Sequence, residues 1–188
     1  GGGLGLLLLG LRFNFLESAL FTAQKSTTLA RGQWWRIFSS AKRLVRYLRC
    51  MGIALPTYLV IGIYATFGNE FGKALGIEGV QAGQCVLFTY IGTVVGDFFS
   101  GFLSQGLRSR KKAIGLMLGM PLVGCLWLLL GGIDSPAQLY ACYAWLGFSI
   151  GYIALFLTTT AEQFGTNLRA TVTTSVANNV RATVLLTL

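Results

Sequence analysis

The sequence contains no histidine and only six acidic residues among 188, which narrows the chemistry open to it. Histidine is a frequent general base and metal ligand, and neither a nucleophile-elbow motif nor a close pair of carboxylates takes its place. The four cysteines form no CxxC pair and lie in or beside apolar runs, where cysteine is usually a small packing residue. We therefore expect no catalytic centre, no metal site and no bound cofactor.

Charge is also scarce, since charged residues make up 11% of the chain and four long stretches have none at all. Each stretch is close to or above the ~20 residues with which a helix crosses a bilayer. Two further apolar segments carry a few polar or charged residues that a protein interior would accommodate. The expected fold is all-α, a polytopic transmembrane helical bundle of about six spans. The expected spans are residues 1–21, 51–69, 80–105, 113–132, 136–160 and 168–188.

The two ends of the chain carry no start or stop signal. There is no initiator methionine, and residues 1–21 lack the basic leader and small-residue cleavage site of a secretory signal. The sequence stops within its last apolar segment. We expect a fragment that is cut at both ends.

Basic residues give the chain a net charge of +9, and most of them gather in connections between the expected spans. Residues 22–50 and 105–112 are basic and contain no acid. Because successive connections between spans lie on opposite sides of the membrane, residues 162–169 fall on the same side as these two segments. Assigning these three segments to the cytoplasm satisfies the positive-inside rule. Nucleic-acid binding is then not needed to explain the charge, and the expected partner of these loops is the anionic inner leaflet of a lipid bilayer.

The connection 22–50 has a helical pattern of its own. Apolar residues recur at helical spacing from Trp34 to Leu48, while Arg36, Arg43 and Arg46 fall on the other side. This pattern predicts an amphipathic helix that lies on the inner leaflet. The alternative is a solvated linker with accidental periodicity.

Glycines at four-residue spacing occur inside three expected spans, and small residues at this spacing let helices approach closely in lipid. The pairs are Gly92 with Gly96, Gly115 with Gly119, and Gly147 with Gly151. They indicate a packed bundle and carry no chemistry.

Two expected spans also carry polar stripes. The first contains Thr89, Thr93, Asp97 and Gly101, at intervals of four; the second contains Thr171, Thr174, Ser175, Asn178 and Arg181, at intervals of three and four. A charge near the bilayer centre costs roughly 2.5 to 3.5 kcal/mol on insertion scales, so such residues usually face protein partners or water. We expect the two stripes to line a shared aqueous cavity, with Thr93, Asp97, Asn178 and Arg181 as candidate coupling and cavity residues.

Each of these candidates has a structural alternative. Asp97 is either a site of proton or cation coupling or a structural carboxylate, paired with a basic residue or hydrogen-bonded in a helix contact. Arg181 either anchors an anionic group through its planar fork of donors or pairs with an acid elsewhere in the protein. Asn178 and Asn179 either contact a ligand or hydrogen-bond a neighbouring helix.

Three stretches follow one another along the chain: RYLRCMGIALPTYLVIGIYATFGNEFGKALGI (46–77), GFLSQGLRSRKKAIG (101–115) and AEQFGTNLRATV (161–172). They are similar, respectively, to the seventh span, to the basic loop between spans eight and nine, and to the loop between spans ten and eleven of one transporter family. In the second stretch, Gln105 stands where the family motif has an acid. In order and spacing the chain resembles the C-terminal half of a bacterial metabolite or sugar transporter of the major facilitator superfamily.

This resemblance implies a partial major facilitator fold. Residues 1–21 would end the sixth span, residues 22–50 would form the cytoplasmic loop between the two halves, and residues 51–188 would form a truncated C-terminal bundle. The implied function is secondary active transport of a small polar organic solute by alternating access, coupled to protons. The implied partner is the N-terminal half of the same transporter, and the implied location is the bacterial inner membrane.

The cytoplasmic loops contain candidate gate residues. One acid, Glu162, shares its membrane surface with the basic cluster of Arg108, Arg110, Lys111 and Lys112 and with Arg169. We expect Glu162 to pair with that cluster or with Arg169 in the outward-open state.

Two other classes of function stay open. A non-transporting membrane sensor or assembly subunit would have the same helices. A membrane-embedded lipid-modifying enzyme is disfavoured because the catalytic residues it needs are missing.

Overall fold

The computed structural model describes residues 3, 34–165 and 168–186 of the chain. The chain divides into two compact units, Gly1–Arg31 and Gly32–Leu188. The predicted span 1–21 and the first part of the predicted loop 22–50 therefore lie outside the described residues, apart from Gly3. All further description concerns the second unit.

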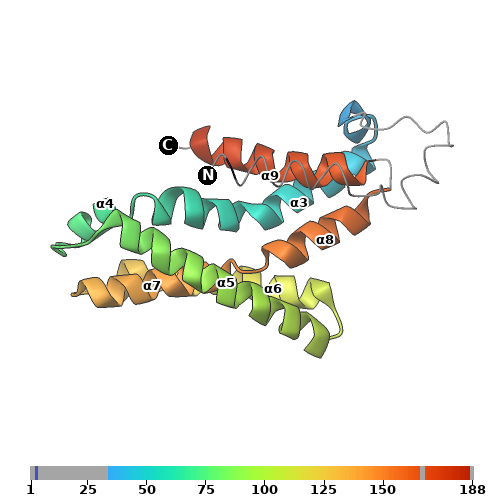
Figure 1. Cartoon of the computed structure of the whole chain (residues 1–188). Coiled ribbons are helices and arrows are strands. Elements are labelled where there is room, and N and C mark those ends of the chain that lie inside the picture. The colour runs from blue at the N-terminus through green and yellow to red at the C-terminus, as the bar shows by residue number, and fades with distance from the viewer. Residues whose placement is uncertain (1–2, 4–33, 166–167, 187–188) are drawn as a thin grey trace. The chain divides into compact units, whose positions relative to one another are not determined.

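Every regular element in the described part of the chain is a helix, which confirms the expected all-α class (Figure 1). The turn η1 is a 3-10 helix, and η2 is a π-helical segment that continues α3 directly. The elements are η1 (Trp34–Ile37), α3 (Ala41–Leu59), η2 (Val60–Ala65), α4 (Gly68–Ala74), α5 (Ala82–Gly106), α6 (Arg110–Leu130), α7 (Pro136–Ser149), α8 (Ile153–Gln163) and α9 (Arg169–Leu186).

Four helical segments among the described residues are long and apolar enough to cross a membrane. They are Ala41–Ala65, Ala82–Gly106, Arg110–Leu130 and Pro136–Gln163, and they match four of the expected spans. Helix α9 coincides with the expected span 168–188 but is not one of these four, since threonines, asparagines and two arginines lower its hydropathy. The chain is therefore a helical protein with four candidate transmembrane segments.

The outer faces of α5 and α6 are covered by large apolar side chains that contact little else in the structure. Phe98 and Phe102 of α5 are 69% and 71% exposed, and Leu129 and Leu130 of α6 are 67% and 80% exposed. Contiguous apolar surface of this kind is unusual for a protein surrounded by water. Lipid is the environment that such a surface fits.

Helix α3 begins at Ala41, well before the expected start of the span at residue 51. The residues predicted to form a separate amphipathic helix thus belong, from Ala41 onward, to the same helix as the span. The physical reason is that residues 41–51 include no glycine or proline to end a helix. Tyr47 and Cys50 on this early part of α3 are buried in the bundle, whereas Leu48 is 54% exposed.

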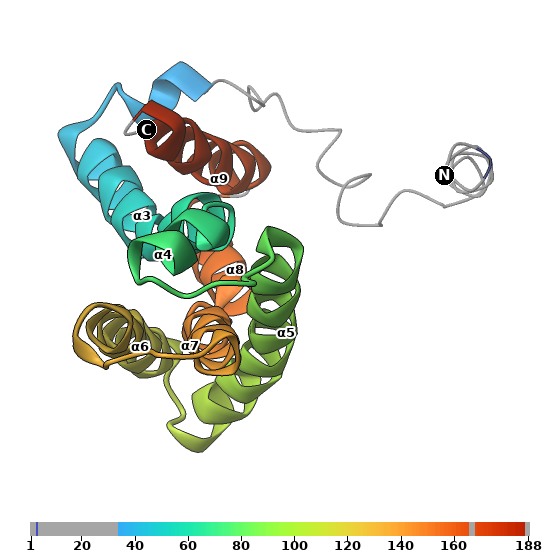
Figure 2. The same cartoon turned by 90° about the vertical axis from the view of Figure 1, so that its left-hand side faces the viewer.

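Helices α5 and α7 form the most extensive helix contact in the bundle, and they lie side by side in Figures 1 and 2. A Cβ atom added at Gly92 would lie 2.1 Å from the Ala144 carbonyl oxygen, and one at Gly96 would lie 2.2 Å from that of Phe148. The backbones approach this closely only because these positions have no side chain. The expected role of the glycine pairs is confirmed here, whereas a Cβ at Gly115 or Gly119 would meet no atom within 4 Å.

This contact gives a direct test of the packing. An alanine Cβ at Gly147 would lie 2.0 Å from the Thr89 carbonyl oxygen, so Gly147→Ala must push α5 and α7 apart. We expect a loss of roughly 1 to 3 kcal/mol of stability, as for other overpacked cores. Thermal unfolding in detergent measures it, with Gly119→Ala as the matched control, which we expect to be neutral or slightly stabilising because alanine favours helix. Equal melting temperatures for the two variants would contradict the described contact.

Candidate functional site

A cavity of about 300 Å³ lies between the α3–η2 segment, α5 and α9, and we call it the Arg181 cavity. Its lining residues are Tyr58, Ile61, Gly62, Thr66, Tyr90, Arg181 and Val184. Within the wall, the π-helical turn of η2 is closed by the Thr66 hydroxyl, which donates a hydrogen bond to the Ile61 carbonyl over 3.0 Å. Single π-helical turns interrupt α-helices rarely, and frequently at functional sites.

Arg181 is the charged group of this cavity. Its guanidinium carbon lies 5.5 Å from the centroid of the Tyr58 ring, which is a cation–π contact between α9 and α3. The ion pairs among the described residues are Lys73 with Glu70 and Arg110 with Glu162, so none of them engages Arg181. Arg181 therefore carries an uncompensated positive charge within the described part of the bundle.

Among the described residues, the two polar stripes do not line the same cavity. Thr89 and Thr93 are buried where α5 meets α7, and each donates a hydrogen bond back to the carbonyl four residues earlier, over 2.7 and 2.9 Å. Of the described α5 residues, Tyr90 lines the Arg181 cavity, and none of the stripe residues does. The reason is that α5 turns its small and hydroxyl-bearing face to α7, and not to α9.

The α9 stripe divides between a helix contact and the cavity. Asn179 donates a hydrogen bond from Nδ2 to the Tyr47 hydroxyl over 2.9 Å, and Tyr47 donates in turn to the Ser175 hydroxyl over 3.0 Å. This network joins α9 to α3, so Asn179 hydrogen-bonds a neighbouring helix, which is one of the two roles expected for it. Asn178 is exposed and lies outside the network, and Arg181 is the stripe residue that lines the cavity.

Asp97 lies half-buried beside the break between α7 and α8, where residues 150–152 interrupt the fourth candidate span. Its Oδ1 atom accepts a long hydrogen bond, 3.4 Å, from the backbone N–H of Ala154 in the first turn of α8. The residue that precedes α8, Tyr152, makes no side-chain cap of its own. A carboxylate is favourable at this position, because the first backbone N–H groups of a helix lack intrahelical partners and carry partial positive charge.

The same break is held close to α5 by glycine. A Cβ at Gly151 would lie 2.5 Å from the Cα atom of Gly96, the residue that precedes Asp97. The Tyr152 hydroxyl donates a 2.8 Å hydrogen bond to the Ile53 carbonyl of α3. Asp97 thus takes part in a helix contact, which is one of the two roles that the sequence left open for it.

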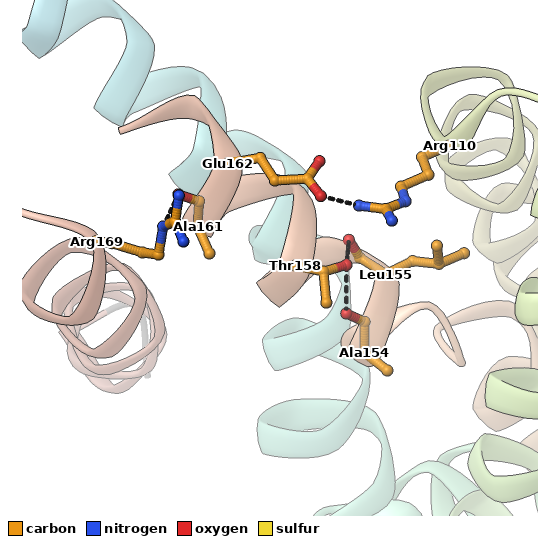
Figure 3. Close-up of polar contacts among 7 residues, drawn as sticks. All are labelled: Arg110, Ala154, Leu155, Thr158, Ala161, Glu162 and Arg169. Atoms are coloured by element: carbon orange, nitrogen blue, oxygen red, sulfur yellow. Dashed lines mark hydrogen bonds and ion pairs between the residues drawn. The ribbon is translucent and has the colours of Figure 1, made fainter. Parts of the chain in front are cut away.

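Three of the candidate gate residues, Arg110, Glu162 and Arg169, meet around the end of α8 (Figure 3). Arg110 at the start of α6 forms an ion pair with Glu162 of α8. Arg169 of α9 donates instead to the Ala161 carbonyl over 3.0 Å, and Arg46 of α3 donates to the Gln163 carbonyl over 2.8 Å. The last carbonyls of a helix lack intrahelical donors, so these guanidinium groups complete the end of α8.

We call these contacts around the end of α8 the junction, and the basic cluster contributes one residue to it, Arg110. Glu162 pairs with Arg110 and not with Arg169, which resolves the alternative in the sequence prediction. Arg108 has a positive φ of 47° in the turn between α5 and α6, and Lys111 is exposed on the first turn of α6. The junction brings three of the segments predicted to share a membrane side, 22–50, 105–112 and 162–169, to the same end of the described bundle.

Three polar residues of the cavity were not predicted from the sequence. Tyr58, Thr66 and Tyr90 belong to no polar stripe, and tyrosine in a span is usually an interfacial anchor. A weak signal was present in Pro56 and Gly62, since both interrupt the regularity of the span that carries Tyr58 and Thr66.

Among the described residues, no group of three or more histidine, cysteine, aspartate or glutamate side chains is placed to hold a metal ion. Comparison with protein-family models, with curated proteins and with solved structures finds no match to this chain.

The Arg110–Glu162 ion pair can be tested by a charge swap. Both side chains are about half exposed, so we expect each single reversal, Arg110→Glu or Glu162→Arg, to lower stability by about 1 kcal/mol or less. The double variant should recover most of that loss. Thermal unfolding in detergent measures the cycle, with Lys111→Glu as a control for charge reversal outside the pair. Strictly additive effects of the two reversals would contradict a direct interaction.

Proposed function

We propose that the chain is the C-terminal part of a secondary active transporter of the major facilitator type, which moves a small polar organic solute by alternating access. The observation that carries this proposal is the Arg181 cavity, a partly open space among helices of a membrane bundle, with an arginine in its wall that forms no ion pair with another described residue. An ionisable residue within a membrane bundle is costly to keep, and is therefore a functional-site candidate by default. The order of the three motif-like stretches supports the same proposal.

Two interruptions of the helices fit a bundle that changes shape. The π-helical turn of η2 lies in the wall of the Arg181 cavity, and the α7–α8 break lies beside Asp97. Transporters commonly place discontinuous helices at the solute and coupling sites, where irregular backbone lines a cavity. We propose that these two points bend when access switches from one side of the membrane to the other.

The proposed inner gate is the junction at the end of α8. Exposed ion pairs such as Arg110 with Glu162 contribute only about 0 to 1 kcal/mol. That amount is enough to shift the balance between two states of similar energy. We propose that this junction faces the cytoplasm of a bacterial inner membrane and holds the inner side closed, with the N-terminal half of the transporter completing the gate.

The proposed function is tested by flux. The full-length protein that contains this chain is reconstituted in proteoliposomes and supplied with radiolabelled organic acids, sugars and amino acids. We expect at least one solute to accumulate above equilibrium when a pH gradient is imposed, and to exchange across the membrane without one. If no solute in the panel crosses in either mode, a non-transporting sensor or assembly subunit becomes the better explanation.

Asp97 is the proposed site of proton coupling. Asp97→Asn keeps an oxygen that accepts the Ala154 N–H and removes the titratable charge. We expect it to abolish accumulation driven by the pH gradient while exchange of the solute survives. Glu78→Gln neutralises an exposed acid outside the expected spans and should leave both modes unchanged. Normal pH-driven uptake by Asp97→Asn would remove Asp97 from the mechanism and leave it only the helix contact.

A further inference from the structure

The polar groups of the Arg181 cavity that have no hydrogen-bond partner among the described residues are those of Arg181, Tyr58 and Tyr90, and all of them can donate hydrogen bonds. Arg181 offers five N–H donors and no acceptor. The hydroxyl groups of Tyr58 and Tyr90 make no hydrogen bond to another described residue, whereas the Thr66 hydroxyl has already donated its proton to the Ile61 carbonyl. None of the described residues that line the cavity carries a carboxylate. A ligand that satisfies this wall must bring acceptors and negative charge.

The cation–π contact leaves the donors of Arg181 available. The attraction acts between the guanidinium charge and the π-electrons of the Tyr58 ring, so it uses no N–H group in a hydrogen bond. It also ties the side chain to α3, which lowers the entropy that binding has to remove. A positioned guanidinium presents parallel N–H groups that match the two oxygens of a carboxylate.

The rest of the wall sets the size and character of the ligand. The volume of about 300 Å³ is at the small end of ligand cavities, and Ile61, Val184 and the two tyrosine rings provide apolar surface. Gly62 keeps the wall thin, because a Cβ there would lie 3.1 Å from a Val184 methyl carbon. One cation in the wall compensates one negative charge and leaves a second one without a partner.

We propose that the Arg181 cavity binds a small organic acid with a single carboxylate, which Arg181 holds by paired hydrogen bonds while the apolar or aromatic body lies against Tyr58 and Tyr90. This inference rests on the proposed transport function, because it names the solute class of the same site. The two proposals can be tested separately, because selective binding of an acid is measurable without any transport across the membrane.

The test is equilibrium binding to the full-length protein in nanodiscs of uncharged phosphatidylcholine. Radiolabelled benzoate and hexanoate are the probes, and benzamide and hexanamide are their neutral isosteres as competitors. We expect each acid to bind at least tenfold more tightly than its amide, because the amide cannot form the charge-assisted pair. Equal affinity for acid and amide, or no binding of either acid, would overturn the proposal.

Variants locate the selectivity at Arg181. Arg181→Gln should bring acid and amide within about twofold of each other, and Arg181→Lys should keep part of the preference because it keeps the charge but loses the fork. Arg49→Gln removes a charge from an exposed position on α3 and should leave the preference unchanged. Tyr58→Phe retains the ring and should bind benzoate normally, whereas Tyr58→Leu should bind it several-fold more weakly.

Two other occupants of Arg181 are outcomes of the same experiment. If Arg181 pairs with an acid elsewhere in the protein, Arg181→Gln will lower the melting temperature without changing the acid-to-amide ratio, and the proposal fails. If the cavity holds a lipid headgroup, phosphatidylglycerol in the nanodisc will abolish benzoate binding, and the proposal fails too. Selective binding without any flux would instead contradict the proposed transport function and leave the binding site established.

Discussion

Because no Cβ atom separates them at Gly92, Gly96, Gly147 or Gly151, α5 and α7 meet backbone to backbone. Two polar contacts elsewhere in the bundle depend on it. It places the end of α7 against Gly96, so that the first turn of α8 starts beside the next residue, Asp97. Helix α8 then runs on to the junction where Glu162 meets Arg110. A separation of α5 and α7 by one methyl group would thus be felt at both the break and the junction.

Hydroxyl groups in this bundle mostly serve the helix that carries them. Thr89, Thr93, Thr158 and Thr174 each donate to the carbonyl four residues earlier in the same helix. In hydrocarbon, an unsatisfied polar group costs several kcal/mol, so such internal bonds are the simplest solution. A polar stripe along a transmembrane helix can therefore mark a helix contact as readily as a cavity. Arg181 differs because a guanidinium is too long and has too many donors to be satisfied in this way.

The spans could be predicted because hydropathy acts over some twenty residues and needs no partner. Hydropathy does not locate the start of α3 at Ala41, because the polarity of the sequence changes near residue 51 while no residue there ends the helix. Arg181 could be singled out by its charge, but Tyr58 and Tyr90 could not, since their meeting depends on packing between distant segments. The partner of Asp97 was equally hidden, because it is a backbone N–H that exists only where α7 and α8 separate. Which basic residue pairs with Glu162 depends on the direction in which each side chain leaves its helix, and the spacing of residues along a loop does not determine that direction.

The break between α7 and α8 has an electrical consequence. An uninterrupted helix of this length would have its partial charges only at its two ends, each equivalent to roughly half an elementary charge. Dividing the helix places a negative end at Ser149 and a positive end at Ile153 within the interior of the bundle. Asp97 lies on the positive side of that step. The fourth candidate span therefore acts as two dipoles in series, and the potential along the bundle changes at the level of Asp97 as well as at the membrane surfaces.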